Sequence, residues 1–154
     1  MAKRFRYQEQ DCPLTLAEGL AEYYKGHPGL FRPAELSEES ARFFRSHDTA
    51  HVVFGLDTTL DQEALADAWT MFGTDVGMRR YARYLQTNQE AKQLLKEIGW
   101  VKIIVLSLRF LPKFVSVWLR TRKMRKKWPW EADDSYQKIP LMQIRRELNL
   151  RLLE

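Results

Sequence analysis

The chain has 154 residues, of which 45% are apolar and 29% charged, and its formal net charge at pH 7 is +5. This length predicts a single domain, residues 1–154, that buries roughly two-thirds of its unfolded surface, and the composition excludes a disordered chain. The single cysteine, Cys12, excludes an internal disulfide framework and indicates a reducing compartment, where we expect it to be a buried or incidental thiol.

Helical periodicity dominates the first third of the chain. Residues 1–9 lack the apolar core of a signal peptide, so we expect a bacterial cytoplasmic protein. A helix is predicted over residues 14–26, and His27 follows it beside a proline and a glycine, which makes His27 a loop residue. Ser37 is a good N-cap for a second helix, which continues through the histidines at positions 47 and 51.

A hairpin between two helices is predicted next. Gly55 can end the second helix in a left-handed cap. Thr58 or Thr59 can start the third helix, residues 60–72, with Gln62 completing a capping box on Thr59. The two helices are therefore expected to pack antiparallel.

The remaining predicted helices cover residues 75–86, 88–98 and 100–122. Asp75 is the expected cap of the first of these, and Pro112 is expected to kink the last. No segment alternates apolar and polar residues as a strand would. The sequence therefore predicts an all-α bundle of about six to seven helices.

Four polar residues around the hairpin form the most informative pattern. His47, Asp48 and His51 point about 0°, 100° and 40° around a helix, so they share one face. His51 lies about one turn before the loop and Glu63 about one turn after it, so antiparallel packing brings the two level. Two imidazoles and two carboxylates that converge in this way predict a divalent-metal site.

A purely structural interpretation of the same residues stays open. In it, Asp48 caps the helix or pairs with Arg45, both histidines are ordinary polar residues, and Glu63 is a first-turn glutamate favoured by the helix dipole. This interpretation accounts for each residue by itself, but it does not explain why all four are expected to lie close together.

The pattern His-Asp-x-x-His, followed after eleven residues by Glu, resembles the metal motif of the coenzyme Q protein four family of ubiquinone biosynthesis. His47, Asp48, His51 and Glu63 fill that motif completely. Gly55 and the closing stretch 140–150 also resemble the family, and the match between these segments is loose. The resemblance makes the four motif residues catalytic metal ligands.

The resemblance implies an enzyme that acts on a polyprenylated benzoate, replaces its C1 carboxyl with hydroxyl, and helps to hold the quinone-biosynthesis proteins together. We expect a divalent metal, zinc first, as a Lewis acid, with redox-active iron, manganese or cobalt as alternatives. A non-catalytic lipid-binding scaffold, in which the same residues hold a structural metal, is the second hypothesis. A His-Asp phosphohydrolase is the third, but the residues available for it, His27 and Asp133 or Asp134, have no supporting spacing.

The second half of the chain is strongly basic. Residues 1–77 carry a net charge of −6 and residues 78–154 a net charge of +11, which predicts a negatively charged partner for the second half. Six of the eight residues 120–127 are Lys or Arg, and Trp128 and Trp130 follow. No nucleic-acid motif accompanies this cluster, so nucleic acid is not the expected partner.

The predicted helix 100–122 combines cationic and apolar positions. Lys102, Arg109, Lys113 and Arg120 lie within about 20° of one line along it. The rest of its surface is broadly apolar, including Phe110, Phe114 and Trp118. This pattern is typical of a helix that lies on an anionic membrane, which here would be the inner face of the bacterial membrane. A long core helix with one solvent-exposed edge explains the pattern equally well.

The expected partners follow from these two features. They are a polyprenyl quinone precursor or other lipid, the membrane surface, other quinone-biosynthesis proteins and a second copy of the chain packed through residues 100–119. An apolar groove between helices would admit such a lipid. Phe54, Trp69 and Phe72 flank the metal motif and could line this groove, although aromatic residues at such positions more often belong to the core.

Overall fold

The computed structural model describes residues 5–30, 37–87 and 100–153. These residues form six α-helices and two 3-10 helices: η1 (Arg6–Gln8), α1 (Leu16–Gly26), α2 (Glu38–Phe54), α3 (Leu60–Gly73), α4 (Gly77–Thr87), α6 (Trp100–Thr121), η3 (Asp134–Lys138) and α7 (Leu141–Leu148). Their only β-type pairings are isolated bridges, Thr15 with Pro140 and Thr74 with Trp128. The all-α prediction is confirmed, and the helix predicted over 88–98 lies outside the described residues.

The ends of α2 are set by local sequence, as predicted. The Ser37 side chain accepts a hydrogen bond from the Ser40 amide at the N-terminus. At the other end Gly55 has φ +71°, in the left-handed region that glycine adopts at little cost. Its ideal Cβ would lie 2.8 Å from Cδ1 of Leu152, so packing also favours glycine there.

Two predicted capping interactions are wrong. Thr59 does precede α3, as predicted, but its capping box with Gln62 is absent, because the Thr59 backbone N–H donates to Oδ1 of Asp57 at 2.8 Å. Asp75 does not cap α4, which begins at Gly77, because its Oδ1 accepts from the Trp130 amide at 2.7 Å.

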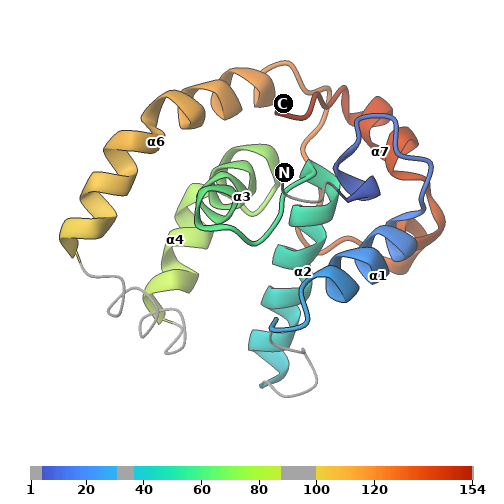
Figure 1. Ribbon diagram of the computed structural model, residues 1–154, viewed down its shortest axis with the longest axis horizontal. Coiled ribbons are helices and arrows are strands. Elements are labelled where there is room, and N and C mark those ends of the chain that lie inside the picture. The colour runs from blue at the N-terminus through green and yellow to red at the C-terminus, as the bar shows by residue number, and fades with distance from the viewer. Residues whose placement is uncertain (1–4, 31–36, 88–99, 154) are drawn as a thin grey trace.

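The α2–α3 hairpin occupies the middle of the molecule (Figure 1). α1 and α7 pack on α2, and α6 arches over α3 as one helix that continues through Pro112. None of the described helices is long and apolar enough to cross a membrane.

Aromatic side chains fill the core beside the hairpin. The rings of Phe54 and Trp69 are both fully buried and stack with centroids 4.7 Å apart. A Cβ on Gly73 would lie 2.9 Å from Trp69, so this close approach depends on glycine. Phe54 and Trp69 are therefore core residues and line no open groove, while Phe72 is half-buried. Cys12 is fully buried, as expected, and burial raises the pKa of its thiol.

Arg145 ties the C-terminal helix to the start of the chain. Its side chain is fully buried and donates to the backbone carbonyl oxygens of Tyr7, Glu9, Val52 and Val53. Desolvation lowers its pKa to about 10. The stretch 140–150 thus holds η1 against the C-terminal end of α2, where the helix dipole favours a cation.

The described side chains of α6 form two apolar faces and one cationic line. Phe110 and Val117 are buried against the core, whereas an outer face, defined here as Leu111, Val115, Trp118 and Leu119, is 42–55% exposed. The cationic line of Arg109, Lys113 and Arg120 lies about 180° around the helix from Leu111. Lys113 pairs with Asp61 at 3.7 Å, and Arg120 donates to the carbonyl oxygens of Arg151 and Leu152. The side chain of Lys102 lies outside the described part of the structure.

Candidate metal centre

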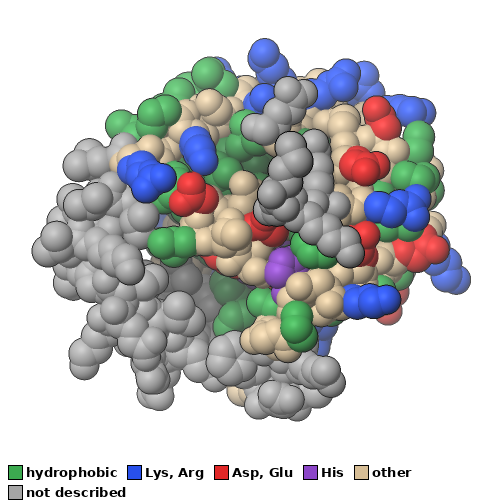
Figure 2. Space-filling model, viewed as in Figure 1, with side chains coloured by type: hydrophobic (Ala, Val, Ile, Leu, Met, Phe, Trp, Pro, Cys, Tyr) green, Lys and Arg blue, Asp and Glu red, His purple; other side chains and the backbone are tan. Residues whose placement is uncertain are grey.

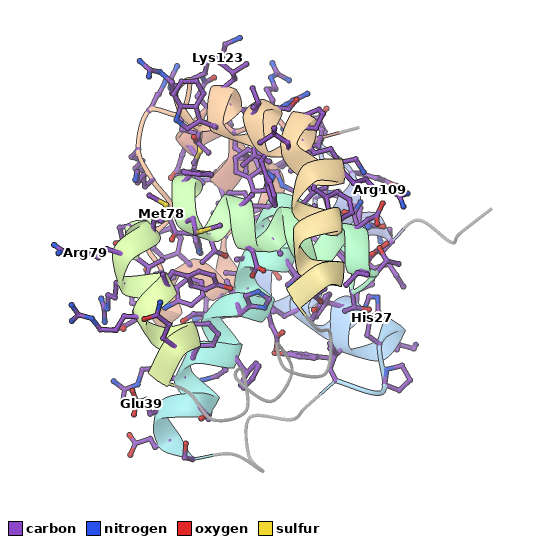
Figure 3. All side chains as sticks on the ribbon, turned by 90° about the vertical axis from the view of Figure 1, so that its left-hand side faces the viewer. His27, Glu39, Met78, Arg79, Arg109 and Lys123 are labelled. Atoms are coloured by element: carbon purple, nitrogen blue, oxygen red, sulfur yellow. The ribbon has the colours of Figure 1, made fainter. Side chains whose placement is uncertain are left out.

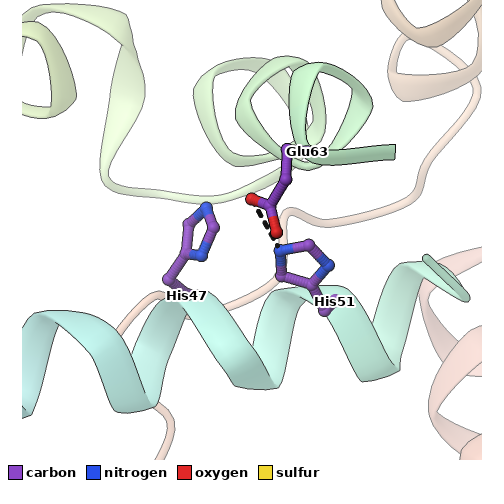
Figure 4. A group of neighbouring side chains, drawn as sticks. All are labelled: His47, His51 and Glu63. Carbon is purple, nitrogen blue, oxygen red and sulfur yellow. Dashed lines mark ion pairs between the residues drawn. The ribbon is translucent and has the colours of Figure 1, made fainter. Parts of the chain in front are cut away.

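Two histidines on α2 face two carboxylates on α3. The helices α2 and α3 cross steeply, so the antiparallel packing predicted from the sequence is wrong: Figure 4 looks along α3 while α2 runs across the picture. At this crossing His51 contacts Glu63, and His47, one turn earlier on α2, contacts Asp67, one turn later on α3. Figure 4 shows the side chains of His47, His51 and Glu63 meeting in the space between the two helices. The hairpin predicted from the sequence thus creates the site.

Three of the four predicted ligands converge. One ligand atom each from His47, His51 and Glu63 lies within 4.8 Å of the others. Nε2 of His51 is 3.3 Å from Oε2 of Glu63. Two ligands that each lie about 2.1 Å from a tetrahedral ion are about 3.4 Å apart, so this pair already has the spacing of ligands on one ion. This group could hold a metal ion.

His51 is the least satisfied side chain of the site. It is fully buried, and among the described residues neither ring nitrogen has a hydrogen-bond partner, because the contact with Glu63 lacks hydrogen-bond geometry. A buried polar group left unpaired costs about 1–3 kcal/mol. A cation beside Nε2 would satisfy one of these nitrogens, so the donor set fits a bound metal.

Asp48 lies outside this group. Its carboxylate is 5% exposed, and Oδ2 accepts a hydrogen bond from the Tyr24 hydroxyl at 2.8 Å. Burial raises its pKa above the ordinary range, although Tyr24 and the two histidines act in the opposite direction. The structure thus gives Asp48 a partner on α1 and does not bring it to the other three predicted ligands.

The carboxylates give the site a negative electrostatic potential, which changes the pKa values of its members. Burial alone would lower the pKa of His47, but Asp67, Glu63 and Asp48 together raise it. Burial alone would raise the pKa of Glu63, yet His51 and His47 outweigh burial and lower it. Glu63 is therefore ionised at neutral pH, as a metal ligand must be.

Asp67 is the residue that the sequence analysis missed. Its Oδ1 lies 3.6 Å from Nε2 of His47 and accepts a hydrogen bond from the Tyr81 hydroxyl at 2.5 Å. The sequence did contain a signal for it. Asp67 lies four residues after Glu63, so it shares the face of α3 that Glu63 presents to the two histidines.

The residues required by the phosphohydrolase hypothesis have other roles. Nδ1 of His27 is 2.8 Å from the Tyr23 carbonyl oxygen, at the end of α1. Asp133 accepts hydrogen bonds from Ser135 at the start of η3, and Asp134 is the first residue of that helix. None of the three belongs to the group of His47, His51 and Glu63.

A centre made of two histidines and one carboxylate matches a known ligand class. This combination occurs in catalytic zinc sites and, with open positions, in non-haem iron sites. Three protein ligands leave at least one of four tetrahedral positions for water or substrate.

No protein family, curated protein or solved structure matches this chain. The resemblance to the coenzyme Q protein four family rests on the motif residues and the closing stretch given above.

Proposed function

We propose that this protein is a metal-dependent enzyme that binds one divalent cation through His47, His51 and Glu63. The observation that carries the proposal is the buried His51: its two ring nitrogens lack hydrogen-bond partners among the described residues, and its Nε2 lies 3.3 Å from Oε2 of Glu63. Zinc is the first candidate, and iron, manganese and cobalt accept the same ligands. Following the family resemblance, we propose a polyprenylated benzoate quinone precursor as the substrate.

The chain's own groups supply binding and charge. The two imidazoles donate lone pairs, and the ionised Glu63 offsets part of the positive charge of the cation. A bound metal supplies Lewis-acid chemistry if it is zinc, or redox chemistry if it is iron, manganese or cobalt. Replacement of a ring carboxyl by hydroxyl is an oxidation, so turnover also requires an oxidant such as dioxygen.

A lipophilic substrate requires access to a bilayer, and we propose that the outer face of α6 rests on an anionic membrane surface. Exposed cations flank the end of this face: the Arg122 guanidinium carbon lies 5.0 Å from the Trp118 ring centroid, and Lys123 and Arg125 follow. Figure 3 shows Lys123 extending away from the end of α6, and Figure 2 shows Lys and Arg gathered along the same edge. Apolar residues beside basic ones favour such surfaces, at about 1 kcal/mol per cation.

A non-catalytic scaffold is the second candidate. The outer face of α6 favours it, because that face offers a lipid contact that needs no chemistry at the hairpin. In this case the metal would be structural and would join α2 to α3. An open coordination position and turnover distinguish the two candidates.

The test begins with elemental analysis of the purified protein and of two matched variants. We expect one equivalent of metal in the wild type, none in His47→Ala/His51→Ala, and an unchanged content in His27→Ala, which removes the remaining histidine. Circular dichroism checks that the variants are folded. No metal in the wild type after incubation with zinc, manganese and iron salts, or equal metal in the double variant, would refute the site.

The metal-loaded protein is then incubated with a polyprenylated benzoate and dioxygen, and the products are identified by mass spectrometry. Loss of the carboxyl and gain of hydroxyl, absent in the double variant, supports the enzyme. Binding of metal and lipid without turnover supports the scaffold.

A further inference from the structure

A second carboxylate faces the histidines from α3. Asp67 lies one turn after Glu63, and its Oδ1 is 3.6 Å from Nε2 of His47. The side chain of Asp67 is 44% exposed and that of His47 only 13%. Asp67 therefore approaches the ring of His47 from the rim of the site, whereas Glu63 meets the fully buried His51 further inside.

Asp67 is itself held in place from α4. The Tyr81 hydroxyl donates to the same Oδ1 at 2.5 Å, and Tyr81 is only 2% exposed. The ring of Phe43 stacks on Tyr81 with centroids 5.7 Å apart and on His47 with centroids 6.1 Å apart. One aromatic side chain thus fixes both the tyrosine that binds Asp67 and the histidine that Asp67 faces.

The two nitrogens of the His47 ring point in different directions. Nε2 is the nitrogen nearest Asp67 on α3. Figure 4 shows both ring nitrogens of His47 beside the space that His51 and Glu63 also face. With Nε2 paired to Asp67, Nδ1 is the nitrogen that remains for a cation in that space.

We propose that Asp67 is a positioning residue for this metal centre: it accepts the Nε2 proton of His47 and so leaves the Nδ1 lone pair for the cation. A neutral imidazole has one donor and one acceptor nitrogen, and the partner of one nitrogen sets the role of the other. Histidines that bind metals almost always donate their second N–H to a carboxylate, carbonyl or water. The inference rests on the metal site proposed above and adds a residue outside its three ligands.

The distance fits a contact that tightens on binding. At 3.6 Å the two atoms are within ion-pair range and beyond the 2.7–3.2 Å of a hydrogen bond. Polar contacts at functional sites are often long without ligand and shorten in the complex. Asp48 cannot take this role, because its carboxylate is buried on Tyr24.

The matched experiment compares Asp67→Ala with Asp61→Ala. Both substitutions remove one carboxylate from α3, but Asp61 pairs with Lys113 and not with a histidine. Zinc affinity is measured by competition with a chelating dye. We expect Asp67→Ala to bind zinc about 10- to 100-fold more weakly, Asp61→Ala to stay close to the wild type, and the stoichiometry to remain one in both.

Two further variants separate positioning from folding. Asp67→Asn keeps the shape and an acceptor oxygen but loses the charge, so we expect an affinity between those of Asp67→Ala and the wild type. Tyr81→Phe leaves Asp67 in place without its hydrogen bond, and we expect a smaller loss than with Asp67→Ala. Thermal unfolding of each metal-free variant shows whether a loss of affinity is a loss of fold.

Nitrogen-15 NMR of the zinc-loaded protein tests the geometry directly. We expect His47 to carry its proton on Nε2 and the metal on Nδ1. Metal on Nε2, or equal zinc affinity in Asp67→Ala and Asp61→Ala, would overturn the role of Asp67 while the metal site stands. A wild type that binds no zinc would instead overturn the metal site, and this inference with it.

Discussion

Arg145 is fully buried, and the hydrogen bonds of its guanidinium go to backbone carbonyl oxygens. It donates to four carbonyl oxygens, from η1 and its flank and from the last turn of α2. Methionine at this position would keep much of the volume but leave those buried oxygens without a donor. Each unpaired buried acceptor costs about 1–3 kcal/mol.

We therefore expect Arg145→Met to lower the free energy of unfolding by about 3 kcal/mol or more. Its neighbour Arg146 is exposed on the same helix, so Arg146→Met should change stability by less than about 0.5 kcal/mol. Urea denaturation followed by circular dichroism measures both. Equal stability of the two variants would show that the buried guanidinium contributes little.

Single residues also show where prediction from the sequence stops. His47, His51 and Glu63 were found because their spacing and one loop suffice to bring them together. The partner of Asp48 could not be found in this way, because Tyr24 lies on another helix 24 positions earlier. The acceptors of Arg145 could not be predicted for the same reason, since they lie up to 138 positions away in the sequence.

At the scale of an element, the end of α2 depends on Gly55. Its φ of +71° is strained for any residue with a Cβ, and an alanine there would also meet Leu152. We expect Gly55→Ala to destabilise the fold by about 1–2 kcal/mol. The control is Gly29→Ala, because a Cβ on Gly29 would meet no atom within 4 Å. Urea denaturation of the two variants measures the difference, and equal midpoints would contradict the role of the left-handed turn.

Helix boundaries were predictable where the cap is a local interaction. Ser37 and Gly55 act within three or four residues, and both were predicted correctly. The capping box on Thr59 was wrong because a nearer acceptor, Asp57, takes the Thr59 backbone N–H that the Gln62 side chain would bind. The prediction that Asp75 caps α4 was wrong because Asp75 binds the Trp130 amide, which lies 55 positions along the chain. Helix α7 was not assigned, although the stretch that contains it had been noted.

At the scale of the whole molecule, the apolar surface of α6 is divided between the core and the outside. The sequence predicted its apolar character but not this division, because the side that faces the core depends on where α3 lies. The cationic line is on the opposite side from the outer face, so the positive charge near that face comes from residues after the helix, such as Arg122 and Lys123.

We expect the protein to sediment with vesicles that contain anionic phospholipid and to bind neutral vesicles much more weakly. The variant Leu111→Ser/Val115→Ser/Leu119→Ser should lose at least about tenfold in affinity, since burial of each side chain contributes on the order of 1 kcal/mol. Met78→Ser is the control, because Met78 is 59% exposed on α4, away from this face (Figure 3). Equal binding by both variants would rule out the outer face of α6 as the contact.

The pairing of α2 with α3 has a consequence for how this sequence can vary. One residue inserted within α3, between Glu63 and Asp67, would rotate Asp67 by about 100° and shift it by about 1.5 Å relative to Glu63. The two carboxylates would then no longer share the face opposite His51 and His47, although no side chain of the site had been replaced. Spacing within each helix is thus inherited together with the ligands, and a distant relative that keeps this centre should keep the four-residue steps from His47 to His51 and from Glu63 to Asp67.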